Sequence, residues 1–378
     1  MKDSTRVLIV GGGVGGLTLA QALHTAGVDV VVYEQDPTPQ TRNQGYRIHI
    51  DPDGNAALGE CLDPQVFDVL RRSSSINGDL VTTFTSGLEL VSALEFPGIP
   101  EKMITAVDRN AFRRGLLTGL DEVVRFGRTV SDYRITESGR VRIEFAEGGG
   151  DEGDLLVGAD GVGSVIRRRL LPNAVVEDFG LRCIYGRMTL TGRLDPDEFN
   201  RGLCWVTEGS TCGAGFGPVV FRTPEDGRPD YLMVTLCATP SRLGVTDDEL
   251  FGMSAQELWK LSTDVVSDWH PAIRDIYAHS DIDSFFPITF RISAPVDNWG
   301  PGPVTLLGDA IHTMPPTAGA GANTALADAA SLAREILSAT RGEKSLTAAV
   351  ADYQTVMLPR GRAAIDNSRR MAAQMFVD

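Results

Sequence analysis

The sequence predicts an α/β protein, α+β overall, in which a Rossmann-like nucleotide-binding domain is joined to a second domain built on an antiparallel sheet. The first observation is a short apolar run at 7–10 that leads into a glycine-rich turn and then a helical pattern at 17–25. The second is a change near residue 180, after which alternating apolar residues and Gly/Pro/Asp turns replace that pattern. Because parallel βαβ units and antiparallel strands have these different patterns, the change indicates two domains.

The glycine-rich turn has the spacing Gly-x-Gly-x-x-Gly at Gly11, Gly13 and Gly16. In a βαβ unit the first glycine permits a tight turn, the second lets the backbone approach a pyrophosphate, and the third lets helix and strand pack closely. The amino terminus of the following helix, next to Val14, offers free N–H groups to the phosphates. Glu34 ends the second apolar run, where an acidic side chain accepts from a ribose hydroxyl and repels a 2′-phosphate. The turn therefore predicts binding of NAD or FAD.

Composition excludes several classes of function. The chain has 378 residues and a net charge of −15, which disfavours nucleic acid and anionic membranes as partners. The five cysteines have no C-x-x-C spacing and the five histidines are scattered, so no metal site is predicted. No apolar run approaches the length of about 18 residues that a transmembrane helix needs. We expect a cytoplasmic protein with buried, reduced thiols and no signal peptide.

The patterns assign 1–72, 97–179 and 286–378 to the first domain and 73–96 and 180–285 to the second. Beyond the first βαβ unit, the predicted strands are 45–50, a hairpin within 81–94, 123–126, 130–135, 141–145, 154–159, 181–191, 203–206, 213–221, 231–238, 287–292 and 304–307. The predicted helices are 53–70 in two pieces broken near Pro64, a helix with Asp108 as its N-cap, 164–171, 249–268, 322–337, and 347–357 continuing toward the end.

Two further buried strands end in motifs that pair an aspartate with a glycine. Asp160-Gly161 closes the strand at 154–159, and Gly308-Asp309 closes the strand at 304–307. Ligands of α/β folds bind at the carboxyl ends of such strands. A loop rich in Gly and Pro, expected at 310–323, leads from Asp309 to a helix, so its last N–H groups can face an anion. The three arginines at 167–169 are interpreted as a solvated helix face.

With all three motifs in order, the chain resembles the single-component (group A) FAD-dependent aromatic monooxygenases with the p-hydroxybenzoate hydroxylase-like fold. The resemblance covers nearly the whole length and implies FAD as the cofactor, with Asp309 on its ribityl chain. It implies that Arg109 reaches the pyrophosphate and ribityl region and that the backbone of Val130 contacts adenine. It also implies that Asp160 serves both flavin and nicotinamide. The residues leave simpler alternatives open, namely that Arg109 is an exposed helix arginine and Asp160 only begins a turn.

The loop after Asp309 has a predicted role at the flavin ring. By resemblance, its N–H groups face the N1–C2=O edge and stabilise the reduced, anionic ring, and Pro316 shapes the wall over it. The residues assigned to the edge are Gly319, Gly321, Ala322 and Asn323.

The resemblance also implies a reaction. NAD(P)H reduces bound FAD as a transient co-substrate, O2 gives a C4a-hydroperoxyflavin, and one oxygen atom passes to an aromatic, polyketide-like or otherwise lipophilic small molecule. The glycines at 213–217 lack the spacing of a second dinucleotide site, which fits a co-substrate that docks without its own Rossmann domain. We expect a monomer or a dimer.

Candidate catalytic residues are few. His49 is the best candidate for a base that deprotonates a phenol, with Arg47 on the same strand face. In relatives this strand runs close to the flavin, so Arg47 is predicted to contact the cofactor or to steer substrate; a structural role for His49 stays open. The predicted apolar wall of the substrate site consists of Trp205, Phe216, Phe221, Tyr231 and Met233.

Other functions on this fold remain as alternatives. An epoxidase differs from a hydroxylase mainly in its substrate, and a non-catalytic flavin-binding protein predicts bound FAD without turnover. A halogenase is disfavoured because Trp205 lacks a W-x-W-x-I-P context and no lysine lies in the three motifs. A plain NAD-dependent dehydrogenase is disfavoured by the third motif.

Overall fold

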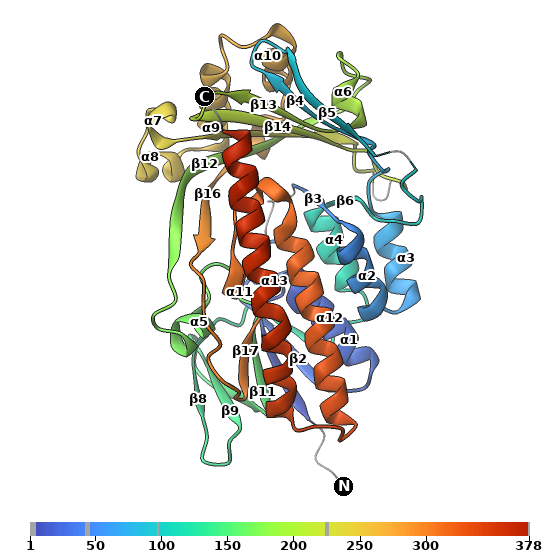
Figure 1. Ribbon diagram of the computed structural model, residues 1–378, viewed down its shortest axis with the longest axis vertical. Coiled ribbons are helices and arrows are strands. Elements are labelled where there is room, and N and C mark those ends of the chain that lie inside the picture. Colours follow the sequence, from blue (N-terminus) through green and yellow to red (C-terminus); the bar gives the residue numbers. More distant parts are fainter. Residues whose placement is uncertain (1–4, 42–45, 97, 224–226, 377–378) are drawn as a thin grey trace.

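The computed structural model describes residues 5–41, 46–96, 98–223 and 227–376. The chain forms two stacked parts (Figure 1), with a broad, mostly antiparallel sheet and its helices at the top and a helix-covered parallel sheet below. The predicted α/β class and the Rossmann-like domain are confirmed. The strand expected at 45–50 is observed as β3 (Arg47–His49), and Gly45 lies outside the described residues.

The lower part is organised around a five-stranded parallel sheet. Its strands, in spatial order, are β17 (Val304–Leu306), β11 (Leu155–Gly158), β1 (Arg6–Val10), β2 (Asp29–Glu34) and β7 (Val124–Phe126). Val7, Leu8 and Ile9 are fully buried because both faces of the sheet are covered, which is why the strand sequence is apolar throughout.

Helices pack on this sheet, and a small antiparallel sheet packs beside its strand β1. The helices are α1 (Val14–Thr25), α2 (Pro52–Cys61), α3 (Pro64–Arg72), α4 (Arg109–Leu116), α5 (Val165–Leu170), α11 (Asp309–His312), α12 (Ala320–Thr340) and α13 (Leu346–Met375), with a 3-10 turn η2 (Pro316–Ala318). The small sheet consists of β8 (Val130–Ile135), β9 (Val141–Phe145) and β10 (Gly150–Gly153). Gly153 packs against Leu8 of β1.

The loop expected at 310–323 is shorter than predicted. Two short helical turns, α11 and η2, occupy its first half, and α12 already begins at Ala320. Gly319 adopts a left-handed φ of +61°. This single residue is both the C-cap of η2 and the N-cap of α12. Asn323 therefore lies in the first turn of the helix instead of before it.

The upper part is a seven-stranded sheet. Its strands, in spatial order, are β16 (Phe286–Ser293), β12 (Val176–Thr189), β15 (Tyr231–Ala238), β14 (Cys212–Val219), β13 (Gly202–Glu208), β4 (Leu80–Thr85) and β5 (Leu90–Glu95). The expected hairpin at 81–94 is confirmed as β4–β5. The boundary expected at 286 is wrong for one strand, because β16 pairs with β12 and so belongs to this sheet.

The two faces of the seven-stranded sheet bury different cores. The outer core packs against α6 (Glu198–Arg201), α7 (Pro240–Leu243), α8 (Asp247–Gly252), α9 (Ala255–Val265), α10 (Pro271–Ala278) and a 3-10 turn η1 (Ile282–Ser284). Phe216 belongs to this outer core, where its ring contacts Phe199 and Tyr277. The prediction that Phe216 lines the substrate site is therefore wrong: strand alternation puts it on the face opposite Trp205 and Met233.

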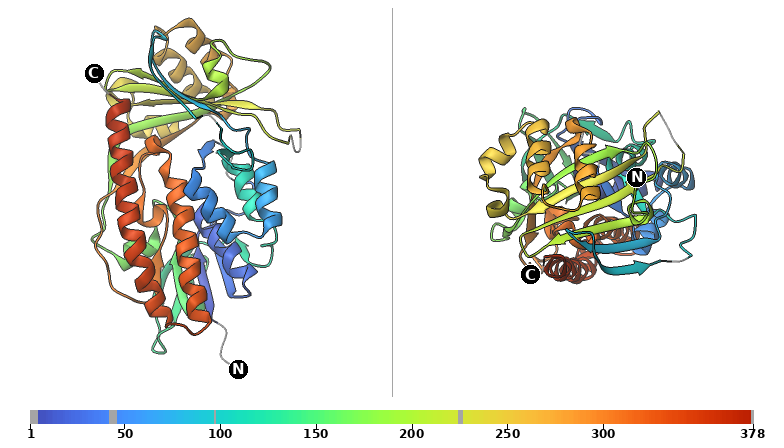
Figure 2. Two further views of the ribbon diagram at one scale, coloured as in Figure 1. Left: turned by 45° about the vertical axis from the view of Figure 1, so that its right-hand side comes forward. Right: turned by 90° about the horizontal axis from the view of Figure 1, so that it is seen from above.

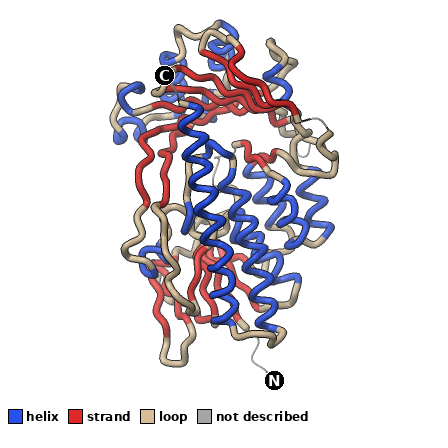
Figure 3. Tube along the Cα trace, viewed as in Figure 1, coloured by secondary structure: helices blue, strands red, loops and turns tan. Residues whose placement is uncertain are grey.

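A small sheet and a long helix help to join the two parts. A two-stranded sheet of β3 (Arg47–His49) and β6 (Ala106–Asp108) lies between them, and α13 runs upward until its end meets the seven-stranded sheet (Figures 1 and 2). There the carbonyl of Met375 accepts hydrogen bonds from Trp205 Nε1 at 3.2 Å and Thr207 Oγ1 at 3.0 Å. Figure 3 shows the long helices of the lower part beneath the strands of this sheet. Within the described ranges, no helix is both long and apolar enough to cross a membrane.

Candidate active site

The three glycine- and aspartate-containing motifs meet at the carboxyl ends of β1, β11 and β17. Gly11 has a φ of +109°, and a Cβ there would lie 2.2 Å from the carbonyl oxygen of Ala159, just before Asp160. A Cβ on Gly15 would lie 2.7 Å from Leu307, just before the Gly308-Asp309 motif. Glycine is therefore required where the first motif touches the other two.

The amino terminus of α1 has the geometry of a phosphate site. A Cβ on Gly16 would lie 2.2 Å from the carbonyl oxygen of Gly11, so this glycine permits close packing. Gly13 is different, because no protein atom lies within 4 Å of a Cβ built there. Gly13 and Val14 are partly accessible, and Gly13, the N-cap residue, has no side chain that could cap the first N–H groups of the helix. The first N–H groups of α1 thus face open space that a pyrophosphate fits.

Glu34 lies at the end of β2 and holds the glycine turn. Its carboxylate accepts the N–H of Gly12 at 2.8 Å and that of Asp36 at 2.9 Å. Arg113 of α4 is 3.3 Å from Glu34 and donates to the carbonyl of Gly12 at 2.9 Å. The sequence analysis did not identify Arg113. Glu34 and Asp36, two acids near the end of one buried strand, could have indicated it, because buried carboxylates need a cation nearby.

Val130 opens β8 on the same side of the sheet. It is buried, and the neighbouring Arg128 donates its backbone N–H to the carbonyl of Glu34 at 2.9 Å. The expected adenine contact of Val130 is thus placed near the expected ribose contact of Glu34. Both contacts stay predictions.

Asp160 uses its side chain to begin α5. It accepts hydrogen bonds from Ser164 Oγ at 2.6 Å and from the backbone N–H of Val165 at 2.8 Å. Burial raises its pKa, and these hydrogen bonds oppose that rise. Its turn role is therefore observed, and its role toward flavin or nicotinamide stays a prediction.

The interpretation of residues 167–169 as a solvated face is wrong for the first of them. Arg167 is buried and donates to the carbonyl of Ala310 at 2.8 Å and that of Val162 at 2.8 Å. It joins the Asp160-Gly161 loop to the Gly308-Asp309 turn. The two arginines that follow it are exposed.

Asp309 and Arg109 approach the same place. The Asp309 side chain is accessible and lies close to Gly321 of α12, since a Cβ on that glycine would be 3.9 Å from Oδ1. The charges of His312 and Arg109 both act on the Asp309 carboxylate. Arg109 is half-buried and lies 5.4 Å above the ring of Tyr46. It is not the freely exposed helix arginine of the simpler alternative.

A buried network that sequence reasoning missed supports the Gly308-Asp309 turn. Asp328, fully buried in α12, accepts the N–H of Gly308 at 3.0 Å and bonds His312 Nε2 at 2.5 Å. Arg360 of α13 lies 2.8 Å from its other oxygen. Burial acts to raise the pKa of Asp328, but these partners lower it overall. Burial acts to lower the pKa of His312, but the charge of Asp328 raises it overall. In the sequence, an aspartate within an apolar helical stretch could have indicated this network.

The first turn of α12 faces the expected flavin position. The residues Gly319, Gly321 and Ala322 are partly accessible, Pro316 is exposed, and the helix has no side-chain cap. Asn323 is buried and ties α12 to β3: its amide donates to the carbonyl of His49 at 3.0 Å and accepts the N–H of Asp51 at 3.1 Å. The uncapped N–H groups and the positive end of the helix dipole suit an anionic ring edge.

Arg47 of β3 points toward the upper part, and His49 lies beside the start of α12. The His49 side chain is accessible beside Gly319, and its Nδ1 lies 3.0 Å from the carbonyl of Thr105. Burial and then the Arg47 charge lower the pKa of His49. Arg47 extends to β14, where a Cβ on Gly217 would lie 2.9 Å from its Cδ. Arg47 thus reaches the seven-stranded sheet, whereas His49 lies next to the residues expected at the flavin ring.

Four of the predicted wall residues lie on the inner face of the seven-stranded sheet. Trp205 lies flat over β14, because a Cβ on Gly213 would be 2.3 Å and one on Gly215 would be 3.4 Å from its ring. The other predicted wall residues on this face are Phe221, Tyr231 and Met233. Within the described ranges, no three His, Cys, Asp or Glu side chains form a metal-binding cluster.

Comparison with known protein families identifies the two nucleotide-binding regions of the chain. Residues 124–368 match the model of the FAD binding domain family, and residues 9–60 match that of the NAD(P)-binding Rossmann-like domain. The chain belongs to the FAD binding domain family. FAD is therefore the cofactor of the site, and the geometry at Gly13, at Asp309 and at the start of α12 fits it.

Relatives in this family are flavoprotein monooxygenases. The chain is 31% identical to the dual O-methyltransferase/FAD-dependent monooxygenase CTB3 of Cercospora beticola, over 99% of the chain and 46% of the relative. It thus spans about half the length of the first curated relatives. It is 29% identical to the phenazine 1,6-dicarboxylic acid hydroxylase PhzS of Lysobacter antibioticus, over 97% of the chain and 89% of the relative.

Solved structures agree on the fold. An FAD-containing monooxygenase of Photorhabdus luminescens aligns with a TM-score of 0.86 at 28% identity, covering 99% of both chains. Klebsiella pneumoniae HpxO, complexed with FAD and uric acid, aligns with a TM-score of 0.81 at 20% identity, over 100% of this chain and 90% of HpxO. The second likeness shows the fold alone.

Proposed function

We propose that this protein is a monooxygenase that uses FAD, NAD(P)H and O2 to hydroxylate an aromatic or polyketide-like small molecule. The observation that carries the proposal is the convergence of three FAD motifs opposite the inner face of the seven-stranded sheet, with β3 between them. FAD, when bound, supplies hydride acceptance and oxygen activation. The chain supplies position, charge and exclusion of water.

His49 is the proposed general base. The carbonyl of Thr105 can only accept, so the contact at 3.0 Å places a proton on Nδ1. In the neutral ring this leaves the Nε2 lone pair free to take a proton from a phenol. The lowered pKa of His49 keeps the ring neutral near pH 7.

The start of α12 is the proposed stabiliser of negative charge on the reduced cofactor. Its first N–H groups are uncapped, and fixed donors aimed at developing charge need no reorganisation during reaction. Asn323 keeps this helix and His49 in register through the hydrogen bond to the His49 carbonyl.

The test is NADH and NADPH oxidation by purified, FAD-loaded protein, with and without a panel of phenols, aromatic acids and polyketide-type aromatics. The proposal expects oxidation that rises with a subset of the panel and a product that gains one oxygen atom from labelled O2. Bound FAD with no stimulation by any aromatic would favour the non-catalytic alternative and reject the proposal.

Epoxidation is the second candidate, because zeaxanthin epoxidase of Oryza sativa is 28% identical over 88% of the chain and 48% of that relative. Product analysis of the same reactions separates the two outcomes. A ring-hydroxylated product supports the hydroxylase, and an oxirane or its diol supports the epoxidase.

A further inference from the structure

Strand β12 carries a bulge where it leaves the lower part of the molecule for the seven-stranded sheet (Figure 1). Asp178 and Arg182 of β12 are four positions apart, but their partners on β16, Arg291 and Thr289, are only two apart. Gly180, within the bulge, has a left-handed φ of +87°. Because a bulge bends its strand and redirects the side chains that it carries, this one determines how β12 enters the upper sheet.

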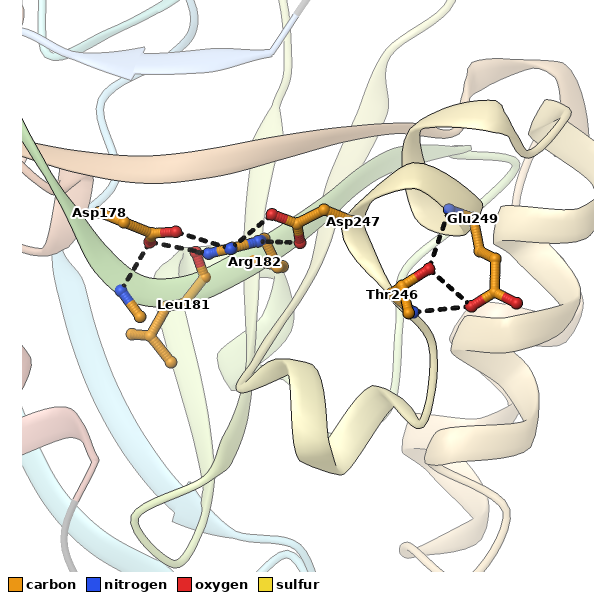
Figure 4. Close-up of polar contacts among 7 residues, drawn as sticks. Asp178, Leu181, Arg182, Thr246, Asp247 and Glu249 are labelled. Carbon is orange, nitrogen blue, oxygen red and sulfur yellow. Dashed lines mark hydrogen bonds and ion pairs between the residues drawn. The ribbon is translucent and has the colours of Figure 1, made fainter.

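The guanidinium of Arg182 fixes the shape of this bulge (Figure 4). Its Nη2 lies 2.7 Å from Asp178, where the bulge begins, and its Nε lies 2.7 Å from Asp247 at the start of α8. Asp178 also accepts the backbone N–H of Gly180 at 2.8 Å. The Arg182 side chain is buried, whereas both carboxylates are exposed. One buried cation therefore holds the two ends of the bulge and the start of α8 together.

Phe179 lies within the bulge and packs against two separate cores. One is the inner-face core of the seven-stranded sheet, which contains Trp205. The other is a small core that consists of Ile292, Met314 and Ile365. Phe179 thus joins the predicted substrate wall to a helix and a loop of the lower part.

Met314 belongs to the loop that is expected at the flavin ring. A Cβ built on Gly321 would lie 4.0 Å from Met314 Cγ and 3.9 Å from Asp309 Oδ1. The residue before Met314, Thr313, accepts the backbone N–H of Ser293 of β16 at 2.9 Å. The ribbon of β12 and β16 therefore meets the expected flavin site in two ways, through a backbone hydrogen bond and through apolar packing.

A buried ion pair often adds little net stability and can instead select one arrangement of the chain. We propose that Arg182 is a positioning residue for the bound flavin: it fixes the bulge, and the bulge places Phe179 against the loop that carries Met314. Arg182 bonds α8 on the outer side of the sheet, so it acts on the cofactor only through Phe179. The proposal needs bound FAD and no particular substrate, so it is independent of the reaction proposed above.

The test compares the FAD-loaded wild type with Arg182→Gln, Phe179→Leu and the double variant. Visible circular dichroism reports the surroundings of the flavin ring, and titration with FAD gives the dissociation constant. Each single variant is expected to change the circular dichroism of the flavin and to weaken FAD binding by about three- to tenfold. Because both changes break the same link, the double variant is expected to bind FAD no more weakly than the poorer single variant.

Asp178→Asn is a milder second variant. Its carboxylate is exposed, and its replacement leaves the pair of Arg182 and Asp247 intact. It is expected to shift the flavin circular dichroism in the same direction as Arg182→Gln, and it decides the question should Arg182→Gln fail to fold.

Arg201→Gln is the matched control. Arg201 also pairs with two carboxylates of the upper part, Asp79 at 3.0 Å and Glu95 at 3.4 Å, but it lies beside β4 and β5, toward the opposite edge of the sheet. Its loss should leave the circular dichroism of the flavin and the FAD dissociation constant unchanged.

Three results would overturn the proposal. The first is a flavin signal and an FAD affinity that stay unchanged in Arg182→Gln and Asp178→Asn. The second is a pair of effects, from Arg182→Gln and Phe179→Leu, that add in the double variant, because Arg182 would then not act through Phe179. The third is the same flavin change in Arg201→Gln, which would show a general loss of stability.

Discussion

Asp328 accepts the backbone N–H of Gly308 at 3.0 Å, and Gly308 immediately precedes Asp309 in the chain. On the other side of Asp309, Arg167 donates to the carbonyl of Ala310 at 2.8 Å. Two buried charged side chains, from α12 and α5, thus hold the residues that flank the expected ribityl contact. The position of Asp309 depends on contacts between elements that are far apart in sequence.

Replacing Asp328 tests this support. Asp328→Asn leaves Arg360 and His312 without their carboxylate, and removal of one partner of a buried ion pair costs about 3–5 kcal/mol. We expect a lower unfolding temperature and a faster loss of FAD, both measured on the same preparation. Asp352→Asn is the control, because Asp352 pairs with Lys344 at the surface and its loss costs less than about 1 kcal/mol. An Asp328→Asn protein as stable as this control would contradict the account.

The His312–Asp328 pair predicts a pH dependence of stability. The pKa of His312 is raised above 6.5 in the folded chain, so its contribution is complete below pH 6.5 and is lost as pH rises through the folded pKa. The pKa of Asp328 is lowered below 3.8, so its contribution is complete above that pH and is lost on acidification. Urea unfolding of the wild type should therefore show a decline in the free energy of unfolding above pH 6.5.

His312→Gln isolates this contribution. The difference in unfolding free energy between wild type and variant should shrink as pH rises above 6.5, because the wild type loses its charged pair there. A difference in unfolding free energy that is constant or that grows with pH would show that the His312–Asp328 pair does not cause the pH dependence of stability.

The open space at Gly13 predicts a variant that folds but does not bind the cofactor. Gly13→Ala adds a methyl group that meets no protein atom within 4 Å but points to the expected pyrophosphate, so FAD affinity should fall while the unfolding temperature of the FAD-free protein stays unchanged. Gly11→Ala, with a φ of +109° and a contact of 2.2 Å to Ala159, should lower both. Gly59→Ala on the exposed face of α2 is the control, which should leave FAD affinity unchanged and slightly raise the unfolding temperature. Normal FAD binding by Gly13→Ala would show that the pyrophosphate does not bind at Gly13.

His49 predicts a change in the pH profile of turnover. His49→Gln keeps a side-chain donor to Thr105 but removes the base, so kcat should fall by about 10²–10⁴-fold. The loss should shrink at alkaline pH, where a phenolic substrate is already ionised. An unchanged kcat across pH would assign His49 a structural role only.

Local patterns explain why much of this fold was predictable. The apolar strands of the parallel sheet, the glycine turn at Gly11 and the N-cap Asp108 are set by residues close in sequence, and the structure has each of them. The sequence did not show which face of β14 carries Phe216, because both faces of that strand are buried.

The remaining differences arise from contacts across the chain. Arg167 is buried because Ala310, far along the sequence, offers it a carbonyl. Arg113 is buried because it serves Glu34 and Gly12 of another element. β16 joins the upper sheet because its partner β12 extends to it, and the strand sequence alone does not identify that partner.

The most direct test of the central claim is the visible spectrum of the purified protein, followed by extraction of its flavin and anaerobic addition of NADH or NADPH with an aromatic acid present. The account predicts one FAD per chain that is bleached by one of the two nucleotides. A colourless chain that does not take up added FAD would contradict it.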